Sequence, residues 1–398
     1  MPRRIIPADP CGLTSAMIHD YPSASVPAAT RPGQHLQRID VLRAVAILCV
    51  FLLHWYGHAF GTDHLRWRGL VLDPASAPSA AFYWFIPLGF GWMGVPLFFV
   101  ISGFCIHASA LKRNELRVGN FLWRRFWRIY PPYLAALFLA IWLNHTTISS
   151  PDGRAQLWSH LLLIHNWRPE WIFALNGVFW SLAVEAQLYL LYPLLWKLRQ
   201  RWGIAGALQI TLAISVATRL VCACFFTDWR KDLSGVVWTS PAILWFDWSL
   251  GAFLAERFLA GRRAFPPQAI WRWTALAVVG LSAFTKATNI FTFSLASVFF
   301  ALVCDSYLHR TRTNSLLERC LVPVGLCSYS FYLIHYPLVP IVAGQLRKLL
   351  PGLNNPALLT SAAPVAIVVV FAISYASYLT IEKGSIALGR RLSRRKAV

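Results

Sequence analysis

Apolar residues along this chain gather into runs of about 20, which is the length a helix needs to cross a bilayer. Ten such segments can be drawn, at about 39–59, 86–110, 122–144, 177–197, 203–226, 236–257, 270–286, 288–308, 321–345 and 358–382. The stretch 157–176 is typical of a short interfacial or re-entrant helix. The pattern predicts an all-α polytopic membrane protein with about ten transmembrane helices.

Basic residues lie between the apolar runs and alternate from loop to loop. With the N-terminus inside, 26 of the 37 Lys and Arg residues fall on the inner side and 9 on the outer side. This bias follows the positive-inside rule, so we expect both termini to be cytoplasmic. It also accounts for the net charge of +21, and membrane lipids rather than nucleic acid are therefore the expected partners.

Composition divides the chain into three parts. Residues 1–37 are rich in Pro, Ser, Ala and Arg and predict a disordered cytoplasmic tail, residues 38–383 form one transmembrane domain, and residues 384–398 form a basic cytoplasmic tail. The eight cysteines lie mostly in apolar runs without metal-ligand or disulfide spacing. No phosphate-loop or dinucleotide motif is evident, so neither a metal nor a bound cofactor is expected.

The first apolar segment carries three ionisable residues on one face. At about 100° per residue, Arg43 and His54 lie about 20° apart around the helix, and Asp40 lies about 40° from His54. Ionisable groups are costly inside a bilayer, which favours a functional interpretation. The alternative is a helix cap and a snorkelling interfacial charge, with His54 packed in the core.

Ionisable residues of two further segments are expected at a similar depth. His54 and His335 each lie roughly 21 Å from the inner ends of their segments, and Glu185 lies roughly 12 Å below the outer surface. Asp247 falls near the midplane and is a weaker candidate for the same cavity. These depths predict a shared site in the outer half of the membrane.

Two other stretches carry candidate binding residues. Arg125 and Arg128 lie one turn apart among aromatic residues, and guanidinium groups in that setting suit phosphates. The alternative is an ordinary positive-inside anchor. Ser102 and Gly103 form a small polar pair in an apolar run, suited either to a substrate path or to a close helix contact.

Five stretches resemble, in order and spacing, the motifs of a known family. They are Arg38–Arg43 with His54, Phe98–Phe104, Arg124–Pro131, Trp180–Tyr189 and Ser328–Pro337. Together they are similar to the acyltransferase-3 family, integral membrane enzymes that include bacterial O-antigen and exopolysaccharide O-acetylases and Nod-factor acetylases. The chain departs from that pattern at Gly94-Val95-Pro96, which lacks a frequent Asp, and after Glu382-Lys383, where a frequent Pro is missing. The hydrolase-like domain that some members append is not expected here.

The resemblance implies an enzyme of the bacterial cytoplasmic (inner) membrane. It would transfer an acyl group, usually acetyl, from cytoplasmic acyl-CoA to a hydroxyl of an extracytoplasmic or lipid-linked glycan. On this hypothesis His54 is the general base or transient acyl carrier, with Glu185 or His335 orienting it or stabilising its charged form. The remaining candidates serve the donor, namely an Asp40–Arg43 ion pair, Arg125 and Arg128 on the CoA phosphates, and Ser102 and Gly103 along the path.

Two alternatives remain open at this stage. One is a transporter or flippase whose His and Glu residues relay protons across the membrane. The other is a membrane acyltransferase that acts on a lipid or a small molecule.

Overall fold

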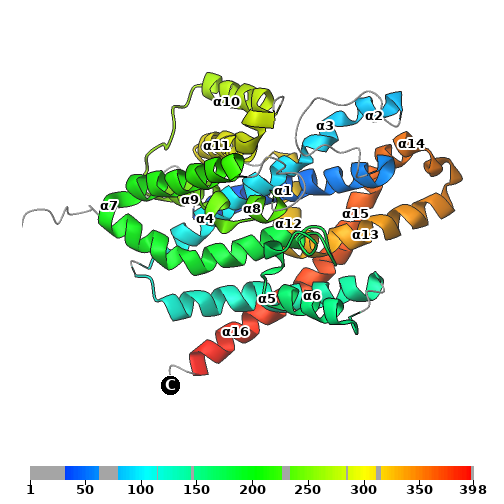
Figure 1. Ribbon diagram of the computed structural model, residues 1–398, viewed down its shortest axis with the longest axis horizontal. Helices are drawn as coiled ribbons and strands as arrows, with labels where there is room; N and C mark the ends of the chain where they lie inside the picture. Colours follow the sequence, from blue (N-terminus) through cyan, green and yellow to red (C-terminus); the bar gives the residue numbers. More distant parts are fainter. Residues whose placement is uncertain are drawn as a thin grey trace, which may run out of the picture.

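The structure is a computed structural model, and it describes residues 32–61, 79–113, 115–144, 148–225, 234–283, 286–310 and 315–395. Within these ranges the chain forms helices and turns and no strands (Figure 1). This agrees with the predicted all-α class. The predicted tail over residues 1–31 and the last three residues of the chain lie outside the described residues.

The helices follow one another with short connections. The first half holds α1 (Pro32–Phe60), α2 (Ala80–Trp84), α3 (Ile86–Gly89), η3 (Phe90–Met93), α4 (Gly94–Leu111), α5 (Val118–Leu143), α6 (Pro151–Leu161), η4 (His165–Trp167) and α7 (Phe179–Phe225). The second half holds α8 (Ser234–Trp238), α9 (Pro241–Leu259), α10 (Ala269–Ser282), α11 (Lys286–Leu308), α12 (Leu316–Leu326), α13 (Ser328–Leu349), η5 (Pro351–Asn354), α14 (Pro356–Ser361), α15 (Ala363–Ser377), the π-helical turn η6 (Tyr378–Glu382) and α16 (Lys383–Arg395).

Six helices in the described part of the chain are long and apolar enough to cross a membrane, or seven if α12 and α13, bent by 76°, form one broken span. One of the six, α7, contains both the fourth and the fifth predicted segments. It turns back at Gly203, whose φ of 69° is left-handed and suits a residue without a Cβ. The structure thus supports a multi-pass membrane protein.

Several boundaries differ from those drawn on the sequence. Helix α1 begins at Pro32, six residues before the predicted domain start at residue 38. The second predicted segment is split into α3, η3 and α4, and the predicted short helix at 157–176 corresponds to α6 and η4. The predicted basic tail is largely the helix α16, which packs along α5.

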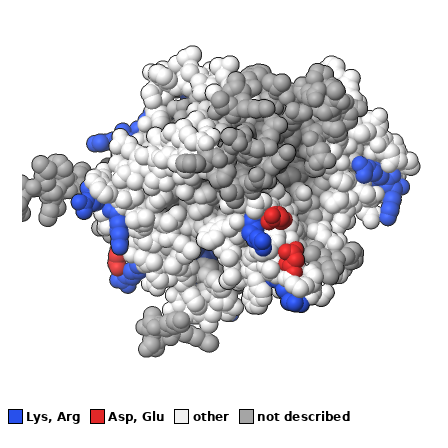
Figure 2. All heavy atoms as spheres, viewed as in Figure 1, with Lys and Arg blue, Asp and Glu red and all other residues white. Residues whose placement is uncertain are grey.

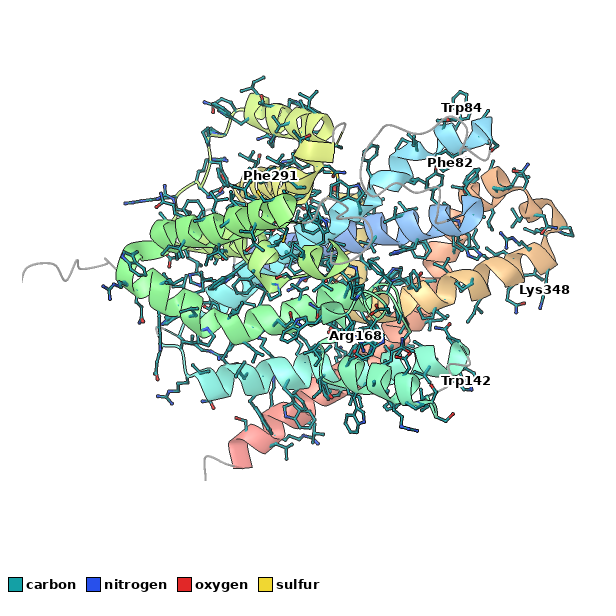
Figure 3. All side chains as sticks on the ribbon, viewed as in Figure 1. Phe82, Trp84, Trp142, Arg168, Phe291 and Lys348 are labelled. Carbon is teal, nitrogen blue, oxygen red and sulfur yellow. The ribbon has the colours of Figure 1, made fainter. Side chains whose placement is uncertain are left out.

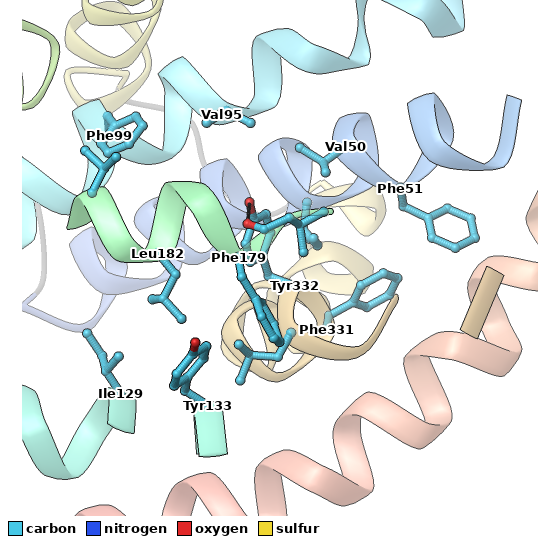
Figure 4. Close-up of a cluster of buried hydrophobic side chains, with 14 of the residues drawn as sticks. Val50, Phe51, Val95, Phe99, Ile129, Tyr133, Phe179, Leu182, Phe331 and Tyr332 are labelled. Carbon is cyan, nitrogen blue, oxygen red and sulfur yellow. Dashed lines mark hydrogen bonds between the residues drawn. The ribbon is translucent and has the colours of Figure 1, made fainter. Parts of the chain in front are cut away.

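Helix α1 lies at the centre of the bundle and packs against α4, α12 and α13 (Figure 1). A large apolar core surrounds it, and Figure 4 shows Phe331 and Tyr332 of α13 facing the same region as Phe179 of α7. Trp55 of α1 is fully buried, and its indole N–H donates to the carbonyl of Leu359 in α14. Buried aromatic residues on several helices therefore hold α1 in one orientation.

The outer surface matches a bilayer environment. On the face seen in Figure 2 most of the surface is uncharged, and Lys and Arg side chains gather mainly toward the two ends of the long axis. The exposed Trp84 and Trp142 lie toward the same end as Lys348 (Figure 3). Tryptophan and basic side chains at one level are typical of a membrane–water interface.

Helices α4 and α9 approach closely through two glycines. A Cβ added to Gly103 would lie 1.9 Å from the carbonyl oxygen of Trp248, and one added to Gly251 would lie 2.0 Å from that of Val100. Backbones at this distance have no room for any side chain, which is the usual role of small residues between membrane helices. The contact sets the position of Ser102, the residue next to Gly103.

We expect Gly103→Ala to destabilise the protein by about 1–3 kcal/mol, because overpacking forces α4 and α9 apart. The melting temperature of the detergent-solubilised protein measures this effect. Gly280→Ala in α10 is the matched control, since nothing lies within 4 Å of its added Cβ. The control should be neutral or slightly stabilising, and equal melting temperatures for both variants would contradict the packing argument.

Candidate active site

A cavity of about 120 Å³ lies among α1, α4, α5, α7 and α13. Its apolar lining includes Phe98, Phe99, Ile129 and Leu182. Its polar lining is made by Arg43, Ser102, Cys105, Arg125, Arg128, Ser181, Glu185, Tyr189, Ser328, Tyr329 and Tyr332. Five of the nine site residues predicted from the sequence, Arg43, Ser102, Arg125, Arg128 and Glu185, thus meet around one space.

Three arginines line one part of the cavity, which we call the arginine end: Arg43, Arg125 and Arg128. The Nε of Arg125 is buried and has no hydrogen-bond partner among the described residues. A buried guanidinium group with an unused donor, beside two further guanidinium groups, suits an anionic ligand. The arginine end therefore fits phosphate groups.

The ion pair expected between Asp40 and Arg43 is present, with Arg43 Nη1 3.1 Å from Asp40 Oδ1. Arg43 also donates through Nη2 to the Sγ of Cys105, 3.3 Å away. Helix α12 holds this end of α1, since a Cβ on Gly325 would lie 1.8 Å from the Asp40 carbonyl oxygen. The pair thus positions Arg43 at the cavity.

A second carboxylate lies near the arginine end. Glu382 in the π-helical turn is 2% exposed and accepts a hydrogen bond of 2.8 Å from Ser330. It interacts electrostatically with Arg128 and Arg43, and Asp40 also interacts with Arg128. Two carboxylates therefore offset part of the positive charge of three arginines.

Glu185 is held in the middle of the cavity by two hydroxyl groups. Ser102 Oγ and Tyr189 OH each donate to its Oε1 over 2.6 Å. Ser102 in turn accepts from the indole N–H of Trp248 at 3.1 Å. This chain of hydrogen bonds joins α4, α7 and α9 and fixes the orientation of the carboxylate.

The two predicted histidines are in direct contact. His335 Nδ1 lies 2.9 Å from the carbonyl of Tyr332 and 3.2 Å from that of Phe331, so it carries the hydrogen. The Nε2 of a neutral His335 is then an acceptor, and it lies 3.1 Å from His54 Nδ1. His54 therefore donates from Nδ1, and its Nε2 keeps a free lone pair. In this tautomer His54 is a base and His335 orients it.

Neither histidine lines the cavity. Tyr332 lies between the two sites, because its side chain lines the cavity while its carbonyl accepts from His335. His335 is fully buried, whereas His54 is partly exposed and has the ring of Tyr336 edge-on at 5.1 Å. The site thus consists of a cavity and a histidine pair joined through one tyrosine.

The segment before α7 closes over this part of α13. Asn176 is buried and donates to the carbonyl of Leu333, and the carbonyl of Val178 accepts from the Tyr332 hydroxyl. Behind it His160 and His165 stack with their ring centroids 4.0 Å apart. Burial lowers the pKa of both imidazoles, so both are neutral near pH 7.

Two residues singled out in the sequence lie elsewhere. Gly103 faces α9 instead of the cavity, as described above. Asp247 is fully buried in another polar cluster, where it accepts from Ser294, which also accepts from Arg219. The described residues contain no group of three or more His, Cys, Asp or Glu side chains suited to a metal ion.

Sequence reasoning missed several residues of the site. Cys105, Ser181, Tyr189 and Tyr332 are of types that are common in buried helices, so nothing in their local sequence marked them. Glu382 carried a usable signal, because it is an acidic residue at the end of an apolar run.

Comparison with known proteins identifies the chemistry. Residues 36–378 match the family model for the acyltransferase domain Acyl_transf_3. The chain belongs to the acyltransferase-3 family. It is therefore an acyl-transferring enzyme, and the transporter alternative loses its support. No solved structure matches this acyltransferase significantly.

Curated relatives are distant but cover most of the domain. Acyltransferase MdmB of Streptomyces mycarofaciens is 27% identical over 63% of this chain and 68% of the relative. Nodulation protein 10 of Rhizobium leguminosarum bv. viciae is 25% identical over 78% and 84%, respectively. O-acetyltransferase OatA of Staphylococcus aureus is 26% identical over 63% of this chain and 46% of its own length.

Proposed function

We propose that this acyltransferase moves an acyl group, usually acetyl, from acyl-CoA to a hydroxyl of an extracytoplasmic or lipid-linked glycan. The observation that carries the proposal is the arginine-lined cavity that ends beside the His54–His335 pair. Both termini and the arginine end face the cytoplasm of a bacterium in this proposal, and the histidine pair lies nearer the outer face of the inner membrane. The charge bias of the loops supports that orientation.

The donor is assigned to the arginine end. Coenzyme A carries several phosphate charges, and Arg43, Arg125 and Arg128 supply guanidinium groups for them. The unused Nε of Arg125 is explained by such a ligand. Glu185 does not hold His54 in this arrangement, because it fixes Ser102 and Tyr189 along the path of the thioester.

The transfer step follows from the tautomer of the histidine pair. His54 Nε2 removes the proton of the acceptor hydroxyl, whose oxygen attacks the thioester carbonyl and forms the ester C–O bond. The C–S bond breaks, and the CoA thiolate takes the proton from His54 to leave as the thiol. His335 stabilises the imidazolium through its Nε2, and its own Nδ1 hydrogen remains on the carbonyl of Tyr332. An acyl-histidine route would begin at the same Nε2.

The acceptor class is supported by the resemblance of the motifs and by the printed name of OatA, an O-acetyltransferase. A hydroxyl acceptor requires a positioned base, and His54 is partly exposed on the side away from the cavity. A lipid or small-molecule acceptor would use the same donor site and the same base. The acceptor must therefore be tested separately from the donor.

The test uses the full chain in nanodiscs with radiolabelled acetyl-CoA. Three acceptors are supplied in parallel: a polyprenyl-diphosphate-linked oligosaccharide, the free oligosaccharide, and diacylglycerol. Release of CoA thiol together with label on either sugar is expected. Label on diacylglycerol alone would support the lipid alternative. Absence of both thiol release and acetyl-CoA binding would overturn the proposal.

A further inference from the structure

One end of the cavity is closed by three side chains, Phe98, Ser181 and Tyr332, which we call the acyl wall. Phe98 lies seven residues from Cys105 along α4, which is roughly 10 Å from the arginine end. The Phe98 and Tyr332 rings meet edge to face with centroids 5.7 Å apart. The wall therefore closes the cavity opposite the arginines.

The wall is held in place by hydrogen bonds of the Tyr332 hydroxyl. This hydroxyl donates to the carbonyl of Val178 at 2.8 Å and accepts from Ser181 Oγ at 2.5 Å. Tyr332 is only 8% exposed, and Phe179 and Phe331 surround it in the core (Figure 4). Such a ring does not move freely, because packing and two hydrogen bonds fix it.

The histidine pair lies directly behind this wall. The rings of Tyr332 and His335 have centroids 5.7 Å apart, and the Tyr332 carbonyl is the acceptor for His335 Nδ1. An acyl group delivered from the arginine end meets the wall before it reaches His54. Whatever occupies the cavity beside Tyr332 is thus limited by the wall and lies next to the base.

We infer that Phe98, Ser181 and Tyr332 determine the length of acyl chain that the enzyme transfers. This inference rests on the proposed function, which places CoA at the arginine end and the acyl carbonyl toward His54. The wall leaves room for a short chain and excludes longer ones. A longer chain displaces the Tyr332 ring, and with it the carbonyl that orients the histidine pair.

The test measures kcat/KM for acetyl-, propionyl-, butyryl- and hexanoyl-CoA with one acceptor. In the natural protein kcat/KM falls about tenfold or more for each methylene beyond the chain that fits, as expected for a tight apolar pocket. Phe98→Ala removes part of the wall and raises the butyryl-to-acetyl ratio of kcat/KM at least about tenfold. Tyr332→Phe, which removes both hydroxyl hydrogen bonds and keeps the ring, raises the ratio less.

Two matched variants separate the wall from general effects on the cavity. Ile129→Ala enlarges the cavity on α5, close to Arg125 and Arg128 in the same helix. Tyr329→Phe removes a hydroxyl that also lines the cavity and donates to a carbonyl, that of Ile129. Both are expected to leave the ratio within about threefold of the natural protein, whatever they do to the overall rate.

The outcomes distinguish this inference from the function on which it rests. Unchanged ratios in Phe98→Ala and Tyr332→Phe, with acetyl transfer retained, overturn the wall and leave the proposed function intact. Equal rises in the wall variants and the controls also overturn it. If the natural protein consumes none of the four acyl-CoA donors, the proposed function and the wall fall together.

Discussion

Replacement of His54 by Ala is expected to lower kcat for acyl transfer by about 10³-fold, because a positioned general base contributes about 10²–10⁴-fold. The free Nε2 of His54 is the atom that accepts the hydroxyl proton, and no other imidazole of the described chain is shown hydrogen-bonded to His335. Donor binding should be unchanged, since His54 does not line the cavity. Initial rates with labelled acetyl-CoA and equilibrium binding of CoA measure the two effects.

His58→Ala is the matched control for this variant. His58 lies one turn further along the same helix α1 and is partly buried, and it is expected to retain activity within about threefold. His335→Ala should lower kcat by about 10²-fold, because the His54 tautomer then loses its acceptor. A folded His54→Ala protein with full activity would remove His54 from the mechanism.

Replacement of Arg125 by Gln is expected to weaken binding of acyl-CoA by about 10- to 100-fold. The loss corresponds to one charge-assisted hydrogen bond, worth about 1.5–3 kcal/mol. The effect should be on KM and on the Kd of CoA, with a smaller change in kcat at saturating donor. Arg125→Lys should recover only part of the affinity, because an ammonium lacks the planar fork of a guanidinium group.

Arg124→Gln provides the control, since it removes the same charge at the adjacent position. Arg124 is not among the residues that line the cavity. Its replacement is expected to change the Kd of CoA by less than about threefold. Equal losses for the two variants would mean that the net charge of α5, and not the cavity, attracts the donor.

Much of the candidate site was readable from local sequence. Helical periodicity placed Asp40, Arg43 and His54 on one face of one helix, and the structure has Arg43 paired with Asp40 while His54 contacts His335. The one-turn spacing of Arg125 and Arg128 was also sufficient to place both at the cavity. In each case the residues lie on one helix, whose pitch fixes their relation.

Contacts between helices were less predictable. His335 and Glu185 were equal candidates to orient His54, because depth along a helix says nothing about rotation around it. The structure pairs His54 with His335, 281 positions away, and Glu185 with Ser102 and Tyr189. Rotation is set by packing such as the contact of Gly103 with the backbone of Trp248. A sequence read one helix at a time contains no such information.

The sequence by itself therefore determined the helical membrane class, the polar face of the first helix and the paired arginines. Those features depend on composition and on the repeat of a single helix. Only the tertiary structure decided that Tyr332 separates the cavity from the histidine pair, and that Asp247 belongs to another cluster. These relations depend on how α4, α7, α9 and α13 cross, and crossing is decided by side-chain packing over the whole bundle.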